Sequence, residues 1–275
     1  MTSYEYTLNE VLLTIQNVGV EFGDRVILRD VNAVVRNIIR PGLSQGQVVG
    51  FLGPSGIGKT QLLRVLAGLQ EPTHGQVLVG TKQEPVSRGL VGVVGQSYPL
   101  FEHRTVLGNL LLAGQQGGLS STAARDGAER YLQRFQLERH ASLYPMQLSG
   151  GQRQRVAIAQ QLLCSNEFLL MDEPFSGLDP IMIDHVAKLI AEVAAMDELR
   201  TIIVVTHDIS AAITVSDTLW LMGRDRDSGD QVVPGARIQN EYNLIERGLA
   251  WNPDVATLPA FADCVRDVRA RFASL

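Results

Sequence analysis

One glycine-rich segment carries the residue types that bind phosphate groups. It reads Gly53-Pro54-Ser55-Gly56-Ile57-Gly58-Lys59-Thr60, a glycine followed by four residues and then Gly-Lys-Thr. In this spacing, backbone N–H groups converge on phosphate oxygens, the lysine ammonium reaches the outer phosphates, and the threonine hydroxyl is a ligand for Mg²⁺. Lysine occurs elsewhere only at Lys82 and Lys188, so its use here favours a chemical role over a flexible loop.

Two adjacent carboxylates follow an apolar run further along the chain. Phe168 to Met171 reads as a buried strand, and Asp172 and Glu173 stand at its carboxyl end. We expect Asp172 to hold Mg²⁺, and Glu173 to orient or deprotonate the water that attacks a terminal phosphate. An acidic pair after a strand is more often a helix N-cap, but the phosphate loop upstream favours the chemical interpretation.

A second segment offers another anion site. Leu148-Ser149-Gly150-Gly151-Gln152 places a Ser-Gly-Gly turn at the start of a helix, where backbone N–H groups attract anions. One triphosphate cannot use both this turn and the phosphate loop of the same chain. An ordinary helix cap is the alternative for this segment taken alone.

Alternating strand and helix patterns surround these motifs, which predicts a doubly wound α/β fold. A tail begins at the charged loop Arg224 to Asp230, and its residues Phe261, Cys264, Val265, Val268 and Phe272 form one apolar helical face. The predicted strands are Leu12 to Val18, Val26 to Val35, Val48 to Leu52, Gln76 to Val79, Leu90 to Val94, Phe168 to Met171, Thr201 to Thr206 and Thr218 to Met222. The predicted helices are Gln61 to Gly68, a helical insert from Thr105 to Arg139 with a break at Gln115 to Ser121, Gly150 to Leu163, and Ile181 to Met196.

The motifs together resemble the ATPase subunits of the ATP-binding cassette (ABC) family, in order and spacing, from Leu12 to about Met222. They are the phosphate loop, Gln96, the Leu148 to Gln152 segment, Asp172-Glu173, Ser176-Gly177-Leu178-Asp179, and His207. The resemblance implies a P-loop NTPase core with a mixed sheet, an N-terminal antiparallel β subdomain, and an α-helical subdomain at residues 97–155. Residues 1–275 then form one ATPase domain, with residues 224–275 as a short C-terminal extension.

The resemblance also implies a role for each motif residue in the binding and hydrolysis of ATP with Mg²⁺. Ser149 and Gly151 would contact the γ-phosphate held by the other protomer of a dimer, so hydrolysis would require dimer closure. Phe22 would stack on adenine, although a core phenylalanine is the alternative, and Asp179 would bridge the dimer interface. The implied nucleotide-binding residues are Phe22, Gly53, Pro54, Ser55, Gly56, Ile57, Gly58, Lys59, Thr60, Ser149, Gly150, Gly151, Gln152 and Asp179; the Mg²⁺ ligands are Thr60, Gln96 and Asp172; the catalytic residues are Glu173, His207 and Gln96.

The run from Ser97 to Leu112 resembles the segment through which such subunits contact a transporter. The implied partners are a second ABC ATPase, in a homodimer or pseudo-dimer, an integral membrane permease and a substrate-binding protein. Within it, the run from Leu100 to Val106, together with the short C-terminal tail, is similar to bacterial importer subunits, including those for nitrate and sulfonates. Such subunits act at the inner face of the cell membrane. A soluble ABC ATPase for cofactor assembly, DNA repair or translation is the alternative, but the coiled coils, zinc modules and second cassette of such relatives are not visible.

Three features depart from the family pattern. Arg36 to Gln47 is longer than the usual turn and predicts an enlarged loop; Gln160-Gln161 and Gly95 replace more common residues. None of them removes a catalytic group, so we expect an active enzyme.

Composition and charge limit the classes of partner and the location of the protein. A formal net charge of -5 and a sequence pI near 5.6 give no basic surface for nucleic acid. Cys164 and Cys264 lack metal-ligand spacing and are expected to be reduced core thiols. Met1 to Glu10 does not resemble a signal peptide, and no apolar run approaches the roughly 20 residues that span a bilayer. We therefore expect a cytoplasmic protein that reaches the membrane through a partner.

Overall fold

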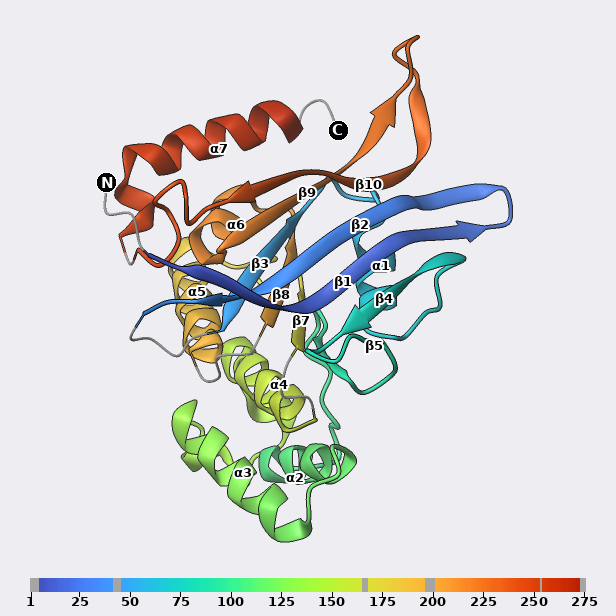
Figure 1. Cartoon of the computed structure of the whole chain (residues 1–275). Coiled ribbons are helices and arrows are strands. Elements are labelled where there is room, and N and C mark those ends of the chain that lie inside the picture. The colour runs from blue at the N-terminus through green and yellow to red at the C-terminus, as the bar shows by residue number, and fades with distance from the viewer. Residues whose placement is uncertain (1–4, 42–45, 165–167, 196–200, 253, 273–275) are drawn as a thin grey trace.

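One mixed sheet organises the chain, and the computed structural model describes residues 5–41, 46–164, 168–195, 201–252 and 254–272 (Figure 1). The strand order is β5-β4-β1-β2-β10-β9-β3-β8-β7-β6. The strands are β1 (Thr7–Phe22), β2 (Arg25–Ile39), β3 (Gln47–Leu52), β4 (His74–Val79), β5 (Glu84–Pro85), β6 (Val91–Val94), β7 (Phe168–Asp172), β8 (Thr201–Thr206), β9 (Thr218–Arg226) and β10 (Val232–Asn243). The helices are α1 (Lys59–Leu66), α2 (Val106–Gln116), α3 (Ser121–Arg134), α4 (Gly150–Cys164), α5 (Pro180–Ala194), α6 (Ile209–Val215) and α7 (Pro259–Phe272).

The half of the sheet that carries the phosphate-loop and acidic motifs is parallel. Strand β3 pairs in parallel with β8 and β9, and β7 pairs in parallel with β8 and β6. Every residue of β3 and β8 is buried, as expected for strands covered on both faces by helices. These pairings bring the carboxyl ends of β3, β7 and β8 to one edge of the sheet, which is where open α/β sheets place their ligands.

The N-terminal strands form the predicted antiparallel part. Strand β1 pairs with β2 and with β4, and both β1 and β2 are longer than the sequence pattern indicated. The predicted helical insert is also present: α2 ends at Gln116 and α3 begins at Ser121, on either side of the expected break. In Figure 1, α2 and α3 lie at the opposite end of the molecule from the hairpin of β9 and β10.

Two expectations from the sequence were wrong in part. Arg36 to Gln47 is a loop only in part, because Arg36 to Ile39 continue β2 and pair with β1, and Gln47 begins β3; residues 42–45 lie outside the described part. The charged segment Arg224 to Asp230 is likewise a loop only in part. Strand β9 continues to Arg226, and the side chain of Asp227 accepts hydrogen bonds from Gly229 and Gln231, which closes a turn into β10.

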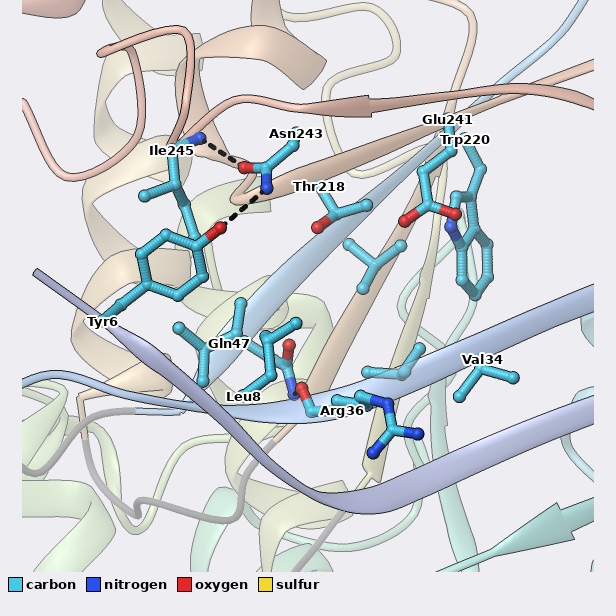
Figure 2. A pocket seen from close by; sticks show the side chains of 13 residues that line it. Tyr6, Leu8, Val34, Arg36, Gln47, Thr218, Trp220, Glu241, Asn243 and Ile245 are labelled. Carbon is cyan, nitrogen blue, oxygen red and sulfur yellow. Dashed lines mark hydrogen bonds between the residues drawn. The ribbon is translucent and has the colours of Figure 1, made fainter. Parts of the chain in front are cut away.

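Strand β10 joins the two halves of the sheet at one point, since it pairs with β2 only through Ala236 and Leu28. Beyond that bridge the strands diverge around a cavity of about 210 Å³ (Figure 2). Figure 2 shows one end of this cavity held by Asn243, which donates a hydrogen bond to Tyr6 Oη at 2.9 Å and accepts one from the Ile245 backbone at 3.1 Å. None of the residues predicted to bind nucleotide or Mg²⁺ lines this cavity.

Candidate active site

The phosphate-loop sequence forms the connection between β3 and α1. Strand β3 ends at Leu52, and α1 begins at Lys59 with Gly58 as its N-cap residue. Gly58 has φ +115°, and a Cβ there would lie 3.0 Å from a methyl group of Leu28 on β2. Gly56 is also left-handed, with φ +76°. Glycine at these positions therefore allows the backbone to bend back over the start of α1, whose first N–H groups have no partner within the helix.

Lys59 is buried inside this loop. Its ammonium group donates hydrogen bonds to the carbonyl oxygens of Gly53, at 2.7 Å, and Pro54, at 3.1 Å. Burial lowers the pKa of Lys59, whereas the carboxylates of Glu173 and Asp172 act to raise it. The fold thus places the only cation of the loop within the electrostatic field of both predicted catalytic acids.

Asp172 is the last residue of β7 and lies beside Val205 of β8. Burial raises the pKa of Asp172, and the Glu173 carboxylate raises it further, while the Lys59 ammonium opposes both effects. Two carboxylates in this surrounding repel each other, and a cation between them and the loop would relieve that repulsion.

Glu173 leaves the strand in an uncommon backbone conformation. Its φ is +51°, in the left-handed region that a residue with a Cβ rarely adopts. Its N–H still donates to the carbonyl of Val205 at 2.8 Å, so the turn is anchored to β8. Such strained residues persist where the surrounding structure holds them, often at functional sites.

Three groups contact a single oxygen of the Glu173 carboxylate. Thr206 Oγ1 donates to Oε2 at 3.1 Å, the His207 backbone N–H donates at 3.4 Å, and His207 Nδ1 lies 2.9 Å away. No described residue makes a hydrogen bond to the other oxygen, Oε1. The carboxylate is therefore fixed through one oxygen while the second can accept a proton from water.

Thr206 is a site residue that the sequence analysis missed. It is the last residue of β8, is fully buried, and also accepts a hydrogen bond from the Asp208 backbone at 3.1 Å. The sequence feature that indicates Thr206 is a polar residue at the end of the apolar run before His207. Its contact with Glu173 depends on the pairing of β7 with β8, which spacing alone does not give.

Gln96 lies in the loop that follows β6, and its side-chain amide donates to Ser176 Oγ at 3.1 Å. Two residues later, Tyr98 Oη donates to the carbonyl of Pro174 at 3.2 Å. Both contacts tie the loop after β6 to the segment after Glu173. The loop after β6 is thus connected by hydrogen bonds to the segment that follows Glu173.

The Ser149 segment caps α4 by reciprocal hydrogen bonds. Ser149 N–H donates to Gln152 Oε1 at 2.9 Å, and Gln152 N–H donates to Ser149 Oγ at 3.3 Å, which is the capping-box arrangement. Gln152 Nε2 also lies 3.0 Å from His140 Nε2. Asp179 caps α5 in a similar way, accepting from the backbone of Ile181 and Met182 at 3.0 Å each.

The structure gathers part of the predicted site in one place. Lys59, Asp172, Glu173 and His207 interact directly or electrostatically. Among the described residues, Ser149, Gly150, Gly151, Gln152 and Asp179 make no hydrogen bond to this group and instead cap α4 and α5. Phe22 lies at the β1–β2 turn with 53% of its surface exposed, next to the strand whose Ile27 and Leu28 approach Gly58.

No helix within the described residues is both long and apolar enough to span a bilayer.

Comparisons of the sequence and of the structure with known proteins all relate this chain to ABC transporter proteins. The family model for ABC transporters matches residues 37–176. The chain is 36% identical to the aliphatic sulfonates import ATP-binding protein SsuB 1 of Rhodococcus jostii, over 83% of this chain and 86% of that protein. It is 36% identical to the sulfate/thiosulfate import ATP-binding protein CysA of Synechocystis sp., over 78% of this chain. It is 38% identical to the Fe(3+) ions import ATP-binding protein FbpC of Rhizobium etli, also over 78% of this chain.

The matches differ in how much of the relative they cover. The chain spans 59% of the CysA protein and 60% of the FbpC protein. Among solved structures, cbiO1 from Clostridium perfringens, described as part of the ABC transporter complex cbiONQ, superimposes with a TM-score of 0.72. That alignment covers 96% of this chain and 97% of the other at 23% identity, so it supports the fold.

Proposed function

Because this chain belongs to the ABC transporter family, we propose that it is a subunit that binds and hydrolyses ATP to power a membrane transporter. The observation that carries this proposal is the convergence of Lys59, Asp172 and Glu173 at the carboxyl edge of β3, β8 and β7. A cation, a metal-binding carboxylate and a held general base are the three groups that phosphoryl transfer to water requires.

The loop from Gly53 to Thr60 binds the triphosphate in this proposal. Backbone N–H groups at the start of α1 contact phosphate oxygens, and the Lys59 ammonium moves from the loop carbonyls to the β and γ oxygens. Phe22 stacks on adenine, for which its half-exposed ring is suited. These residues supply binding energy and orientation.

Thr60, Gln96 and Asp172 are the proposed Mg²⁺ ligands. They fit the ion because each offers a hard oxygen donor and because Thr60 and Gln96 are exposed. The raised pKa of Asp172 is the second indication, since burial and the neighbouring Glu173 carboxylate both disfavour its negative charge, and a bound cation would offset both effects. When bound, Mg²⁺ neutralises charge on the β and γ oxygens.

Glu173 is the proposed general base. Thr206 and His207 hold its Oε2, so Oε1 accepts the proton of the attacking water. His207 Nδ1 faces Glu173, which leaves Nε2 of the same ring to contact the γ-phosphate. Gln96, in the loop that follows β6, orients the same water.

In this proposal a second protomer completes the nucleotide-binding site. Ser149 and Gly151 stand at the start of α4, where unpaired helix N–H groups attract an anion, and Gln152 holds Ser149 in place. Asp179, at the start of α5, aligns the opposite site across the interface. The dimer is formed either by two copies of this chain or by this chain with a similar ATPase.

The helical subdomain at residues 97–155 is the proposed docking element for an integral membrane permease. It exposes large apolar side chains, Phe101 at 43%, Tyr144 at 44% and Met146 at 79%, which a protein partner would cover. The adjoining Gln96–Ser176 and Tyr98–Pro174 contacts link this surface to the catalytic turn. We therefore propose that the chain lies in the cytoplasm, at the inner face of the cell membrane, and that residues 224–275 are a C-terminal extension.

Import is the proposed direction of transport, because the three relatives above are named import ATP-binding proteins. A substrate-binding protein is then a further partner. The alternative is a soluble ABC ATPase without a membrane subunit. Affinity purification from solubilised membranes separates the two: an integral membrane protein should be recovered with the chain, whereas recovery of soluble partners alone would favour the alternative.

A mixing experiment tests the catalytic assignment. Glu173→Gln removes the base and Ser149→Arg blocks the anion site, so each variant alone should bind ATP without turning it over. Random pairing of the two variants makes half of the dimers mixed, each with one intact composite site, so the mixture should recover about a quarter of wild-type turnover. Hydrolysis by Glu173→Gln alone would contradict the base, and failure of the mixture to recover turnover would contradict completion of the site in trans.

A further inference from the structure

A second cavity lies between three helices and contains none of the Lys59, Asp172 and Glu173 cluster. Its volume is about 260 Å³. The carboxyl end of α3, the first two turns of α4 and one face of α5 form its walls. These helices are labelled in Figure 1. Helix α3 belongs to the helical insert, and α5 begins after the segment that follows Glu173. The cavity therefore joins two parts of the chain that are far apart in sequence.

Positive charge dominates the walls of this cavity. Arg134, Arg155 and Lys188 each contribute a cation, and Glu192 contributes the one carboxylate. The cavity thus has a net charge of +2 with His185 neutral, in a chain whose formal net charge is -5. Arg155 is fixed, because its Nη1 donates to the carbonyl of Phe135 at 3.1 Å. Within the described part of the chain its other guanidinium donors make no hydrogen bond, so they are available to a ligand.

A buried amide lies in the same wall. Gln154 is only 3% exposed, and its Nε2 has no hydrogen-bond partner among the described residues. An unpaired amide donor in a protein interior is unfavourable, so a buried donor next to a cavity indicates an acceptor that is bound there. Gln154 therefore adds a neutral donor to the cations around the cavity.

Apolar side chains complete the lining. Phe135, Val186 and Leu189 are each less than 10% exposed and face the cavity from α3 and α5. The volume lies just below the roughly 300–1,000 Å³ of typical small-molecule pockets, and a cavity of about 150 Å³ already holds benzene. A small ligand with an apolar body matches this size.

From these features we propose that the cavity between α3, α4 and α5 binds a small organic anion, with its acidic group on Arg155, Lys188 and Gln154. The apolar body of the ligand packs on Phe135 and Leu189. Gly151 also lines this cavity, so the ligand touches the first turn of α4. Binding itself does not depend on ATP hydrolysis, and it can be measured in the absence of nucleotide.

Benzenesulfonate is the probe, because it joins one anionic group to one ring. Isothermal titration calorimetry on the full chain should detect its binding at millimolar concentration. Inorganic sulfate lacks the ring and benzyl alcohol lacks the charge, so each should bind about tenfold more weakly or worse. Equal binding of either compound, or no binding of benzenesulfonate, would overturn the proposal.

Two variants locate the site. The double variant Arg134→Gln/Lys188→Gln removes two exposed charges, and Gln154→Leu replaces the buried donor with an apolar side chain of similar size. Each should weaken benzenesulfonate binding about tenfold or more. The control Arg130→Gln/Lys82→Gln removes the same charge from exposed positions outside the cavity and should bind as the unmodified chain does. Undiminished binding by the first double variant, with the melting temperature unchanged, would place the anion elsewhere and refute the site.

Discussion

A buried carboxyl group should make the stability of this protein depend on pH in a defined way. Asp217 lies between α6 and β9, is 4% exposed, and accepts a hydrogen bond from the Val48 backbone at 2.7 Å. Burial raises its pKa from 3.8 to about 7, against the opposing effects of the Val48 N–H, the Trp251 side chain and Arg40. The folded protein therefore keeps a proton on Asp217 that the unfolded chain has already released.

The sign and size of the effect follow from proton linkage. Between pH 3.8 and about 7 the folded state binds more protons than the unfolded state, so the free energy of unfolding falls as the pH rises. One pKa unit corresponds to 1.36 kcal/mol, so this group alone lowers the free energy of unfolding by about 4 kcal/mol across that interval. The stability that it contributes is complete below pH 3.8 and is lost once the pH exceeds about 7.

Asp217→Asn isolates this contribution, because asparagine can still accept the Val48 hydrogen bond but does not titrate. Urea unfolding of both proteins should give a difference in free energy of unfolding that moves by about 4 kcal/mol in favour of the variant between pH 4 and pH 8. The exposed Asp126→Asn on α3 is the control and should show no such movement. A difference that stays constant within about 1 kcal/mol would show that the Asp217 carboxyl ionises as readily in the fold as in water.

Three other substitutions probe the loop, a helix start and a tight turn. Lys59→Ala should weaken ATP binding about tenfold or more, measured by equilibrium dialysis, since it removes a charge-assisted contact to the phosphates. Thr105→Ala should lower the free energy of unfolding by about 1 kcal/mol, because Thr105 Oγ1 caps α2 by accepting from the Gly108 N–H at 3.0 Å; an unchanged urea midpoint would contradict this. Gly75→Ala should cost about 2 kcal/mol or more, since its φ is +80° and a Cβ would lie 2.2 Å from a backbone oxygen of β1; a melting temperature equal to that of the unmodified chain would refute it.

The elements that sequence predicted best are those with a local signal. The run Val48 to Leu52 and the glycines after it led to a strand, a loop and a helix, and β3 and α1 lie there. The break at Gln115 to Ser121 was likewise visible from its small and polar residues. In both cases the pattern and the structure extend over the same few residues.

Strand β10 is an element that local sequence patterns do not predict. Pro234 and Gly235 interrupt its sequence and are typical of a turn, and the sequence analysis predicts no strand after Met222. In the structure Gly235 has φ +85°, and a Cβ there would lie 2.7 Å from Arg29 Cβ. The glycine thus allows close approach to β2, a requirement set by a strand some two hundred residues earlier in the chain.

The sequence by itself determined the phosphate loop and the cap of α4, because each depends on glycine conformations or hydrogen bonds that span only a few residues. Tertiary structure alone decided that Thr206 and His207 hold Glu173, that Asp217 is buried, and that cations and an unpaired amide surround one cavity. Those relations depend on strand order and helix packing. Such contacts form between segments that are far apart in the chain, so local sequence patterns do not predict them.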